Sequence, residues 1–310
     1  MGNIAASIRQ RLLNLSRQQG RPFQEVLQFY IMERFLYRLS QSKHADRFVL
    51  KGALMLQVWE SPQARPTMDI DMLGRTDNDM EVLVAQLREV ICTDLSDEDG
   101  LVFDGDSLEA DTITEDADYE GVRIRGWAEL SGARARLQLD IGFGDAVVPE
   151  PLSMRYPVLL DLPAPELLCY SRESAIAEKV QAMVALGPIN SRMKDFYDIW
   201  LLSRQFHFYR DVLVQAISAT FERRHTPIPE PPLFAPGFAD EKQVQWRAFL
   251  RRLGEGVPAE AEFPTVLTVL ENFIGYALEA NIADLPAMHW APGGPWEKGK
   301  WRSGSEPNRT

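Results

Sequence analysis

The sequence predicts an α+β protein of two domains, a sheet-containing domain followed by a helical one. Of the 310 residues, 45% are hydrophobic, which is enough apolar material for more than one core. Residues 101–145 alternate between apolar and polar side chains with a period of two, as strands do. After Pro151 the spacing of apolar residues becomes helical. We therefore expect a mixed or antiparallel sheet with helices in residues 1–155, a helical domain in 156–285 and a disordered tail in 286–310.

Apolar spacing also locates the elements of the first domain. Ile4, Ile8 and Leu12 recur at helical intervals, Gly20 ends that helix, and Pro22 stands where the next helix begins. The expected elements are helices at 3–19, 22–36, 53–59 and 76–92, strands at 48–51 and 67–73, and a mostly antiparallel set of strands within 101–145. Strands and helices therefore interleave along this half of the chain.

Helical spacing continues through the second domain. The helices are expected at 164–186, 191–206, 209–224, 240–253 and 260–280. A proline-rich stretch at 226–238 separates the third of them from the fourth, and its composition is typical of a stiff linker.

Composition excludes several classes of protein. The net charge is −12, with 45 acidic against 33 basic residues, which argues against a protein that coats nucleic acid without specificity. Two cysteines and four scattered histidines give neither a zinc site nor a disulfide framework. No apolar run approaches the roughly 20 residues that cross a bilayer, and the N-terminus lacks a secretory signal. We expect a cytoplasmic protein with no membrane partner.

Three aspartates on two predicted strands form the sharpest functional pattern. Asp69 and Asp71 point to one face of a strand, because strand side chains alternate, while Ile70 faces the core. Asp140 lies on a later strand between apolar neighbours. Carboxylates held close together repel unless a cation compensates, and all-oxygen ligation suits Mg²⁺ or Mn²⁺. Such a trio can hold two metal ions for phosphoryl or nucleotidyl transfer.

A glycine turn precedes these acids. Lys51, Gly52 and Ala53 join a predicted strand to a predicted helix. Glycine lets the backbone approach a phosphate, and a helix N-terminus presents unpaired N–H groups. Alone, the turn means little, and a lone Asp-x-Asp is most often a solvated strand face. Together with Asp140 they favour a metal-dependent nucleotidyltransferase.

Five segments of the chain resemble the AbiEii toxin family of nucleotidyltransferases. That family is the toxin half of the AbiE-type (type IV) toxin–antitoxin systems and is related to the MenT toxins and the DNA polymerase β superfamily. The segments are Phe48–Leu54, Arg65–Asp71, Leu139–Asp145, Ala177–Met183 and Asn190–Asp198. The last two are the most family-specific, and the resemblance extends over residues 1–285. It implies a polymerase-β-like nucleotidyltransferase core followed by a helical domain.

The resemblance assigns roles around the predicted acid site. Asp69 and Asp71 look like the metal-binding pair, and Asp140 stands where the third acid of the superfamily is expected. Gly52 matches the first glycine of a Gly-Gly or Gly-Ser motif. Ala53 departs from that motif, so a serine hydroxyl contact to the nucleotide phosphate is missing and only the backbone N–H could serve.

Further candidates lie downstream and just before the acids. Lys179 resembles the family lysine that faces the nucleotide phosphates, and Asp195 resembles the acid of the final motif. From the residues alone, Lys179 is equally well a surface lysine. Lys194, a weaker candidate for nucleotide binding, is explained as well by an i,i+4 helix pair with Asp198. Arg65 either neutralises a phosphate or pairs with the acid cluster.

The implied activity is transfer of a nucleoside monophosphate from an NTP to RNA, with the 3′ end of tRNA as one acceptor and growth arrest as the outcome. The implied partner is a helix-turn-helix antitoxin, which need not form a stable complex with the toxin. Two other functions stay open. A module that binds NTP without transfer is supported by Ala53, and a metal-dependent nuclease also needs clustered acids and a lysine.

Two groups of arginines are candidates for an RNA-phosphate groove on an otherwise acidic protein. The alternative is ordinary solvated charge. The groups are Arg123, Arg125, Arg134 and Arg136 on predicted strands, and Arg9, Arg11, Arg17 and Arg21 near the N-terminus.

Overall fold

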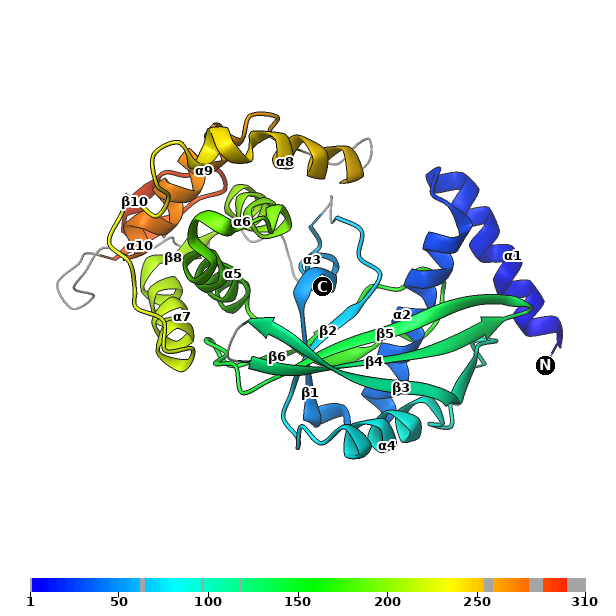
Figure 1. Cartoon of the computed structure of the whole chain (residues 1–310). Coiled ribbons are helices and arrows are strands. Elements are labelled where there is room, and N and C mark those ends of the chain that lie inside the picture. Colours follow the sequence, from blue (N-terminus) through cyan, green and yellow to red (C-terminus); the bar gives the residue numbers. More distant parts are fainter. Residues whose placement is uncertain are drawn as a thin grey trace. The chain divides into compact units, whose positions relative to one another are not determined.

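The computed structural model describes residues 2–61, 65–95, 98–116, 119–253, 259–278 and 287–299 (Figure 1). The chain divides into two compact units. The first comprises residues 1–145 and 151–170, and the second comprises 146–150 and 171–310. The chain therefore passes between the units three times.

A mixed seven-stranded sheet forms the centre of the first unit. Its strand order is β3-β4-β5-β2-β1-β7-β6, with β2 parallel to β5, β1 parallel to β7 and the other neighbours antiparallel. The strands are β1 (Phe48–Lys51), β2 (Ile70–Gly74), β3 (Val102–Asp116), β4 (Tyr119–Leu130), β5 (Ala133–Phe143), β6 (Leu152–Arg155) and β7 (Glu166–Cys169). The predicted fold class, a mixed sheet with helices, is confirmed.

The helices of the first unit are α1 (Gly2–Gln19), α2 (Phe23–Gln41), α3 (Met55–Val58) and α4 (Met80–Ile91). Helix α2 packs on β5, α4 packs on β3, and the two helices contact each other. Gln28 Nε2 donates to the carbonyl oxygens of Arg136, at 2.8 Å, and Met68, at 3.2 Å. These bonds tie α2 both to β5 and to the segment that leads into β2.

A buried pair of charges on α2 holds the segment before β7. The side chains of Glu33 and Arg34 are each 1% exposed and lie 2.9 Å apart. Glu33 Oε2 accepts from the Leu159 backbone N–H at 2.6 Å, and Arg34 donates to the Pro163 carbonyl at 2.7 Å. The segment therefore belongs to the first unit, and the unit boundary lies at 170/171 where the sequence predicted 155/156.

The predicted helix at 164–186 begins later than expected. Residues 166–169 form β7, with Leu167 and Cys169 buried, and Cys169 pairs with Leu50 of β1. The helix starts after Ser171, whose Oγ accepts from the Ser174 backbone N–H at 3.0 Å. Pairing with a strand distant in sequence overrides the local helical spacing here.

Helices make up most of the second unit, as predicted. They are α5 (Arg172–Leu186), α6 (Met193–Gln205), α7 (Arg210–Arg223), α8 (Phe238–Leu253), α9 (Phe263–Leu270) and α10 (Tyr276–Leu278), with a π-helical turn at 271–275 before α10. An aromatic cluster fills part of their core: the ring of Phe196 lies 5.2 Å from that of Phe263 and 6.0 Å from that of Phe238.

Part of the predicted disordered tail is regular structure. Strands β8 (Phe208–Tyr209), β9 (Met288–Trp290) and β10 (Trp296–Lys298) form a small antiparallel sheet. The indole N–H of Trp290 donates to the Ser203 carbonyl at 2.6 Å, and that of Trp296 to the Phe273 carbonyl at 3.0 Å. The packing and hydrogen bonds of these tryptophans order 287–299, whereas residues 300–310 lie outside the described part of the chain.

No helix in the described ranges combines the length and the apolar character that a membrane crossing requires.

Burial of Glu33 makes stability depend on pH. Desolvation, opposed by Arg34, raises the pKa of the Glu33 carboxyl from 4.5 to about 7. Between these values the folded protein holds a proton that the unfolded chain releases. The contribution to stability is therefore present below pH 4.5 and is lost as the pH rises through 7.

The variant Glu33→Gln keeps the acceptor for Leu159 and does not titrate. As the pH rises from 4.5 to about 7, we expect the free energy of unfolding of the wild type to fall by about 3 kcal/mol relative to this variant. Urea titrations of both proteins at several pH values measure the difference. A difference that does not change with pH would contradict the prediction.

Candidate active site

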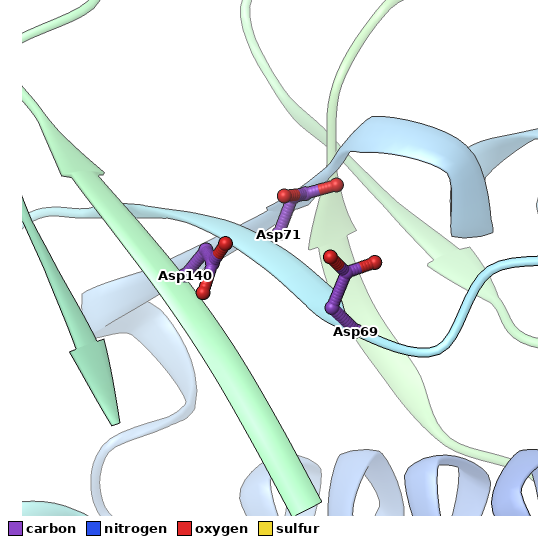
Figure 2. Close-up of side chains that lie close together, drawn as sticks. All are labelled: Asp69, Asp71 and Asp140. Carbon is purple, nitrogen blue, oxygen red and sulfur yellow. The ribbon is translucent and has the colours of Figure 1, made fainter. Parts of the chain in front are cut away.

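Three carboxylates meet on one face of the central sheet (Figure 2). In the parallel pairing of β2 with β5, Asp71 lies directly opposite Asp140. Asp69, two residues before Asp71, immediately precedes β2 and points to the same side. One carboxylate oxygen of each acid lies within 4.8 Å of one from each of the others. The structure therefore brings together the three acids that the sequence singled out.

The strand pattern explains why the acids face away from the core. Ile70 and Met72, which alternate with Asp71, are fully buried, as are Leu139 and Ile141 on either side of Asp140. Apolar residues thus anchor one face of each strand, and the intervening aspartates occupy the other.

Arg123 on β4 is part of this acid cluster. It lies opposite Asp140 in the antiparallel pairing of β4 with β5. Its Nε and Nη2 donate to the two oxygens of Asp140, at 2.7 and 2.5 Å. The hydrogen bond to Asp140 raises the pKa of the guanidinium, and the charges of Asp140, Asp69 and Asp71 add to the effect. This pair of hydrogen bonds orients the Asp140 carboxylate.

From its sequence context, Arg123 is predicted only as one of several arginines on a basic face. A signal for its role was present, because Arg123 and Asp140 both lie on outward positions of strands joined by a short hairpin turn. The register of that hairpin was needed to make them partners.

Gly52 makes room for Asp71. Its φ is +73°, and a Cβ atom at this position would lie 1.9 Å from Asp71 Oδ2. The contact arises because β1 is antiparallel to β2, with Lys51 opposite Asp71. Glycine is therefore required here both by the backbone conformation and by the approach of a site carboxylate.

The turn after Gly52 differs from the predicted phosphate loop. Ala53 is 4% exposed, within a short 3₁₀ turn at Gly52–Leu54, and α3 has only four residues. So short a helix provides little dipole at its N-terminus. Within this turn, Gly52 is the residue that lies against the acid site, beside the Asp71 carboxylate.

A buried ion pair stands beside the site. Lys51 Nζ lies 2.8 Å from Asp145 Oδ2, and both side chains are almost fully buried. The same ammonium group lies 5.8 Å from the centroid of the Tyr170 ring. This pair ties the end of β1 to the segment after β5, and the sequence analysis did not predict it.

A second charged cluster lies within the second unit. Lys179 Nζ on α5 is 3.0 Å from Asp195 Oδ1 and 2.9 Å from Asp198 Oδ2, both on α6. Arg192 Nε lies 2.8 Å from Asp195 Oδ2. Asp195 and Asp198 are only 2% and 3% exposed. Lys179 and Asp195, predicted separately, are therefore direct partners.

The two remaining candidates, Lys194 and Arg65, differ in exposure. Lys194 is exposed, and Asp198, its expected helix partner, bonds to Lys179. Arg65 is half-buried in the segment that leads to Asp69.

The donor set at the acid site suits a hard divalent cation. Three carboxylates provide oxygen ligands only, from a half-buried to buried position. Mg²⁺ and Mn²⁺ prefer such ligands, whereas zinc sites are built mainly from cysteine and histidine. No histidine or cysteine belongs to this cluster within the residues that the structure describes.

Comparison with known proteins decides the family. Residues 34–272, more than half of the chain, match the sequence model of the family described as nucleotidyl transferase AbiEii toxin, type IV TA system. The chain belongs to the AbiEii family. It is therefore a nucleotidyltransferase of a toxin family, and membership implies an antitoxin partner.

Two solved structures are similar to this AbiEii chain. One is the crystal structure of JHP933 from Helicobacter pylori, 15% identical, with a TM-score of 0.48 over 83% of this chain and 94% of that chain. The other is described as a candidate nucleotidyltransferase from H. pylori, also 15% identical, with a TM-score of 0.46 over 83% of this chain and 96% of that chain. No curated protein matches the sequence.

We predict that Gly52→Ala prevents metal binding at the AbiEii acid site, because the added methyl group would displace Asp71. Isothermal titration calorimetry of the purified protein with Mn²⁺ measures the loss of metal affinity. Gly20→Ala is the matched control, since Gly20 also has a positive φ (+66°) but nothing within 4 Å of its Cβ position.

Both variants place alanine in a left-handed conformation, at a cost of roughly 1–2 kcal/mol. Only Gly52→Ala should lose affinity for Mn²⁺. Equal affinity in the two variants would show that the contact with Asp71 does not matter for the site.

Lys179 compensates two buried carboxylates, so Lys179→Met should destabilise the second unit by about 3–5 kcal/mol. Lys194→Met removes the same charge from an exposed position of the neighbouring helix and should leave the melting temperature unchanged. Thermal denaturation of both variants compares them. Equal melting temperatures would refute a structural role for Lys179.

Proposed function

We propose that this AbiEii chain transfers a nucleoside monophosphate from an NTP to RNA, with Asp69, Asp71 and Asp140 as ligands of Mg²⁺ or Mn²⁺. The supporting observation is the convergence of the three carboxylates within 4.8 Å on neighbouring strands. In the reaction, the hydroxyl oxygen of the acceptor bonds to the α-phosphorus, the bond to pyrophosphate breaks and the hydroxyl proton is released. The bound cation supplies charge neutralisation for the phosphates.

The residues of the site have separate tasks in this proposal. Asp71 and Asp140, opposite each other across two paired strands, hold a cation between rigid elements. Arg123 keeps Asp140 oriented through two hydrogen bonds. Gly52 leaves the space in which the Asp71 carboxylate lies. We propose that the backbone at Gly52 and Ala53, together with Arg65, contacts the nucleotide.

For Lys179 we propose the phosphate contact that the family resemblance implies, with Asp195 as the residue that positions it. Two carboxylates, at 3.0 and 2.9 Å, hold the Lys179 ammonium in a defined place while leaving its side chain 17% exposed. Lys194 is exposed and has the weaker support of the two lysines.

RNA is the proposed acceptor class, and the 3′ end of tRNA is the acceptor to test first. Modification of such an end would block translation, which accounts for growth arrest by a toxin. The proposed partner is a helix-turn-helix antitoxin, which need not form a stable complex with this chain.

A second candidate function is NTP binding without transfer. It is favoured by Ala53, which stands where the family motif has glycine or serine and is buried, so no hydroxyl is present to contact a phosphate. In that case nucleotide would bind to the chain and no labelled product would form.

We expect Asp71→Ala to abolish transfer of label from α-³²P-NTP to total RNA in the presence of Mg²⁺ or Mn²⁺, while the fold is retained. Asp94→Ala, which removes an exposed acid from the same unit, is the control and should keep full activity. Gel electrophoresis of the RNA gives the readout, and circular dichroism verifies the fold.

Wild-type transfer by Asp71→Ala would refute the proposed site. Shortened RNA in place of labelled RNA would identify a nuclease. Binding of NTP by the wild type without product, tested with all four NTPs, would identify the NTP-binding module.

A further inference from the structure

Strands β4 and β5 carry a row of polar side chains that leads away from the acid cluster. In their antiparallel pairing, the outward-facing pairs are Arg123 with Asp140, Arg125 with Gln138, Trp127 with Arg136, and Glu129 with Arg134. The intervening residues of both strands are buried. Exposure rises along this row, from buried at Asp140 to exposed at Trp127, Arg134 and Arg136.

The cations at the two ends of the row differ in their partners. Near the acid cluster, Arg123 is bound to Asp140, and Arg125 donates to Asp111 of β3 at 2.7 Å. Farther along, Arg134 and Arg136 are exposed, and neither forms an ion pair with another residue in the described ranges. The cations that are available to an anionic ligand are therefore the two at the far end.

Trp127 stands between these cations with 40% of its surface exposed. The guanidinium of Arg134 lies over its ring, 4.8 Å from the centroid. The Trp127 backbone N–H donates to Ser107 Oγ of β3 at 2.9 Å, which holds this position of the strand. An exposed aromatic face beside arginines is the arrangement on which nucleobases stack.

We propose that Trp127, Arg134 and Arg136 form a platform for the single-stranded end of the acceptor nucleic acid. This proposal rests on the transfer activity proposed above. A base stacks on Trp127, and the two arginines bind the flanking phosphates. The platform lies four residues from Asp140 along β5, about 13 Å at the rise of a strand. The platform therefore holds the acceptor strand to one side of the acid cluster. The terminal hydroxyl of the acceptor is then directed to the metal ligands.

A nucleic acid explains this surface better than a protein partner does. The chain as a whole carries a net charge of −12 and repels polyanions, so a bound strand needs local cations. Arg134, over the ring of Trp127, and Arg136, opposite Trp127 in the strand pairing, provide them. Stacking depends little on which base is present, which suits an acceptor recognised by its free end.

Fluorescence anisotropy of a short single-stranded RNA, labelled at its 5′ end, tests the platform. Without NTP no transfer occurs, so the measurement reports binding alone. We expect Trp127→Ala to weaken binding at least fivefold, the lower limit of one base stack, and Trp127→Phe to restore most of it. Arg134→Gln with Arg136→Gln should reduce the slope of log affinity against log salt by about 1.4, the value for two phosphate contacts to a single strand.

The matched control is Arg251→Gln with Arg252→Gln, which removes two exposed charges from α8 and should leave RNA affinity and the salt slope unchanged. Melting temperatures close to that of the wild type show that Trp127 does not serve mainly to stabilise the hairpin. The proposal is overturned if the wild type does not bind the RNA, or if Trp127→Ala and the double arginine variant bind it as tightly as the control does.

The same variants separate this proposal from the proposed function. Loss of RNA binding in Trp127→Ala, with no transfer by the wild type, would support the platform and refute the transferase. Transfer by the wild type with unchanged acceptor KM in Trp127→Ala would support the transferase and overturn the platform.

Discussion

The parallel pairing of β2 with β5 is the constraint on which the acid site depends. It sets Asp71 opposite Asp140 and brings Asp69 alongside, so that three like charges share one face of a sheet. Such repulsion has a cost that neighbouring groups must offset. Buried apolar residues on the opposite face of both strands supply part of the stabilising free energy, and the fork of Arg123 on Asp140 supplies part of the compensating charge. Strand register, more than any single side chain, thus brings the three carboxylates together.

The alternation of apolar and polar residues predicted the parts of the site that lie within one strand. It did not predict pairs of residues that come from different elements. Alternation was enough to place Asp69 and Asp71 on one face, and to anticipate Asp140 on another strand. The partnership of Arg123 with Asp140, and that of Lys51 with Asp145, depends on register and sheet order, which composition does not encode locally.

The errors in secondary structure have the same origin. Strand β7 was predicted as the start of a helix, since its four residues directly precede a strongly helical segment and only pairing with β6 and β1 makes them a strand. Beyond residue 286, glycines and prolines concealed the order that two hydrogen-bonded indoles impose. By contrast, helices with long apolar stripes, such as α1 and α4, were located nearly to the residue at their C-terminal ends.

The winding of the chain between its two units has a consequence for biosynthesis. Strand β1 is made early, yet its parallel neighbour β7 leaves the ribosome only after β3, β4 and β5 and after residues 146–150, which belong to the other unit. One edge of the nascent sheet therefore stays open while translation continues, and a chaperone or the growing chain must shield it from association with other strands. A gene fragment that stops at 145 would encode the three acids and leave that edge open permanently.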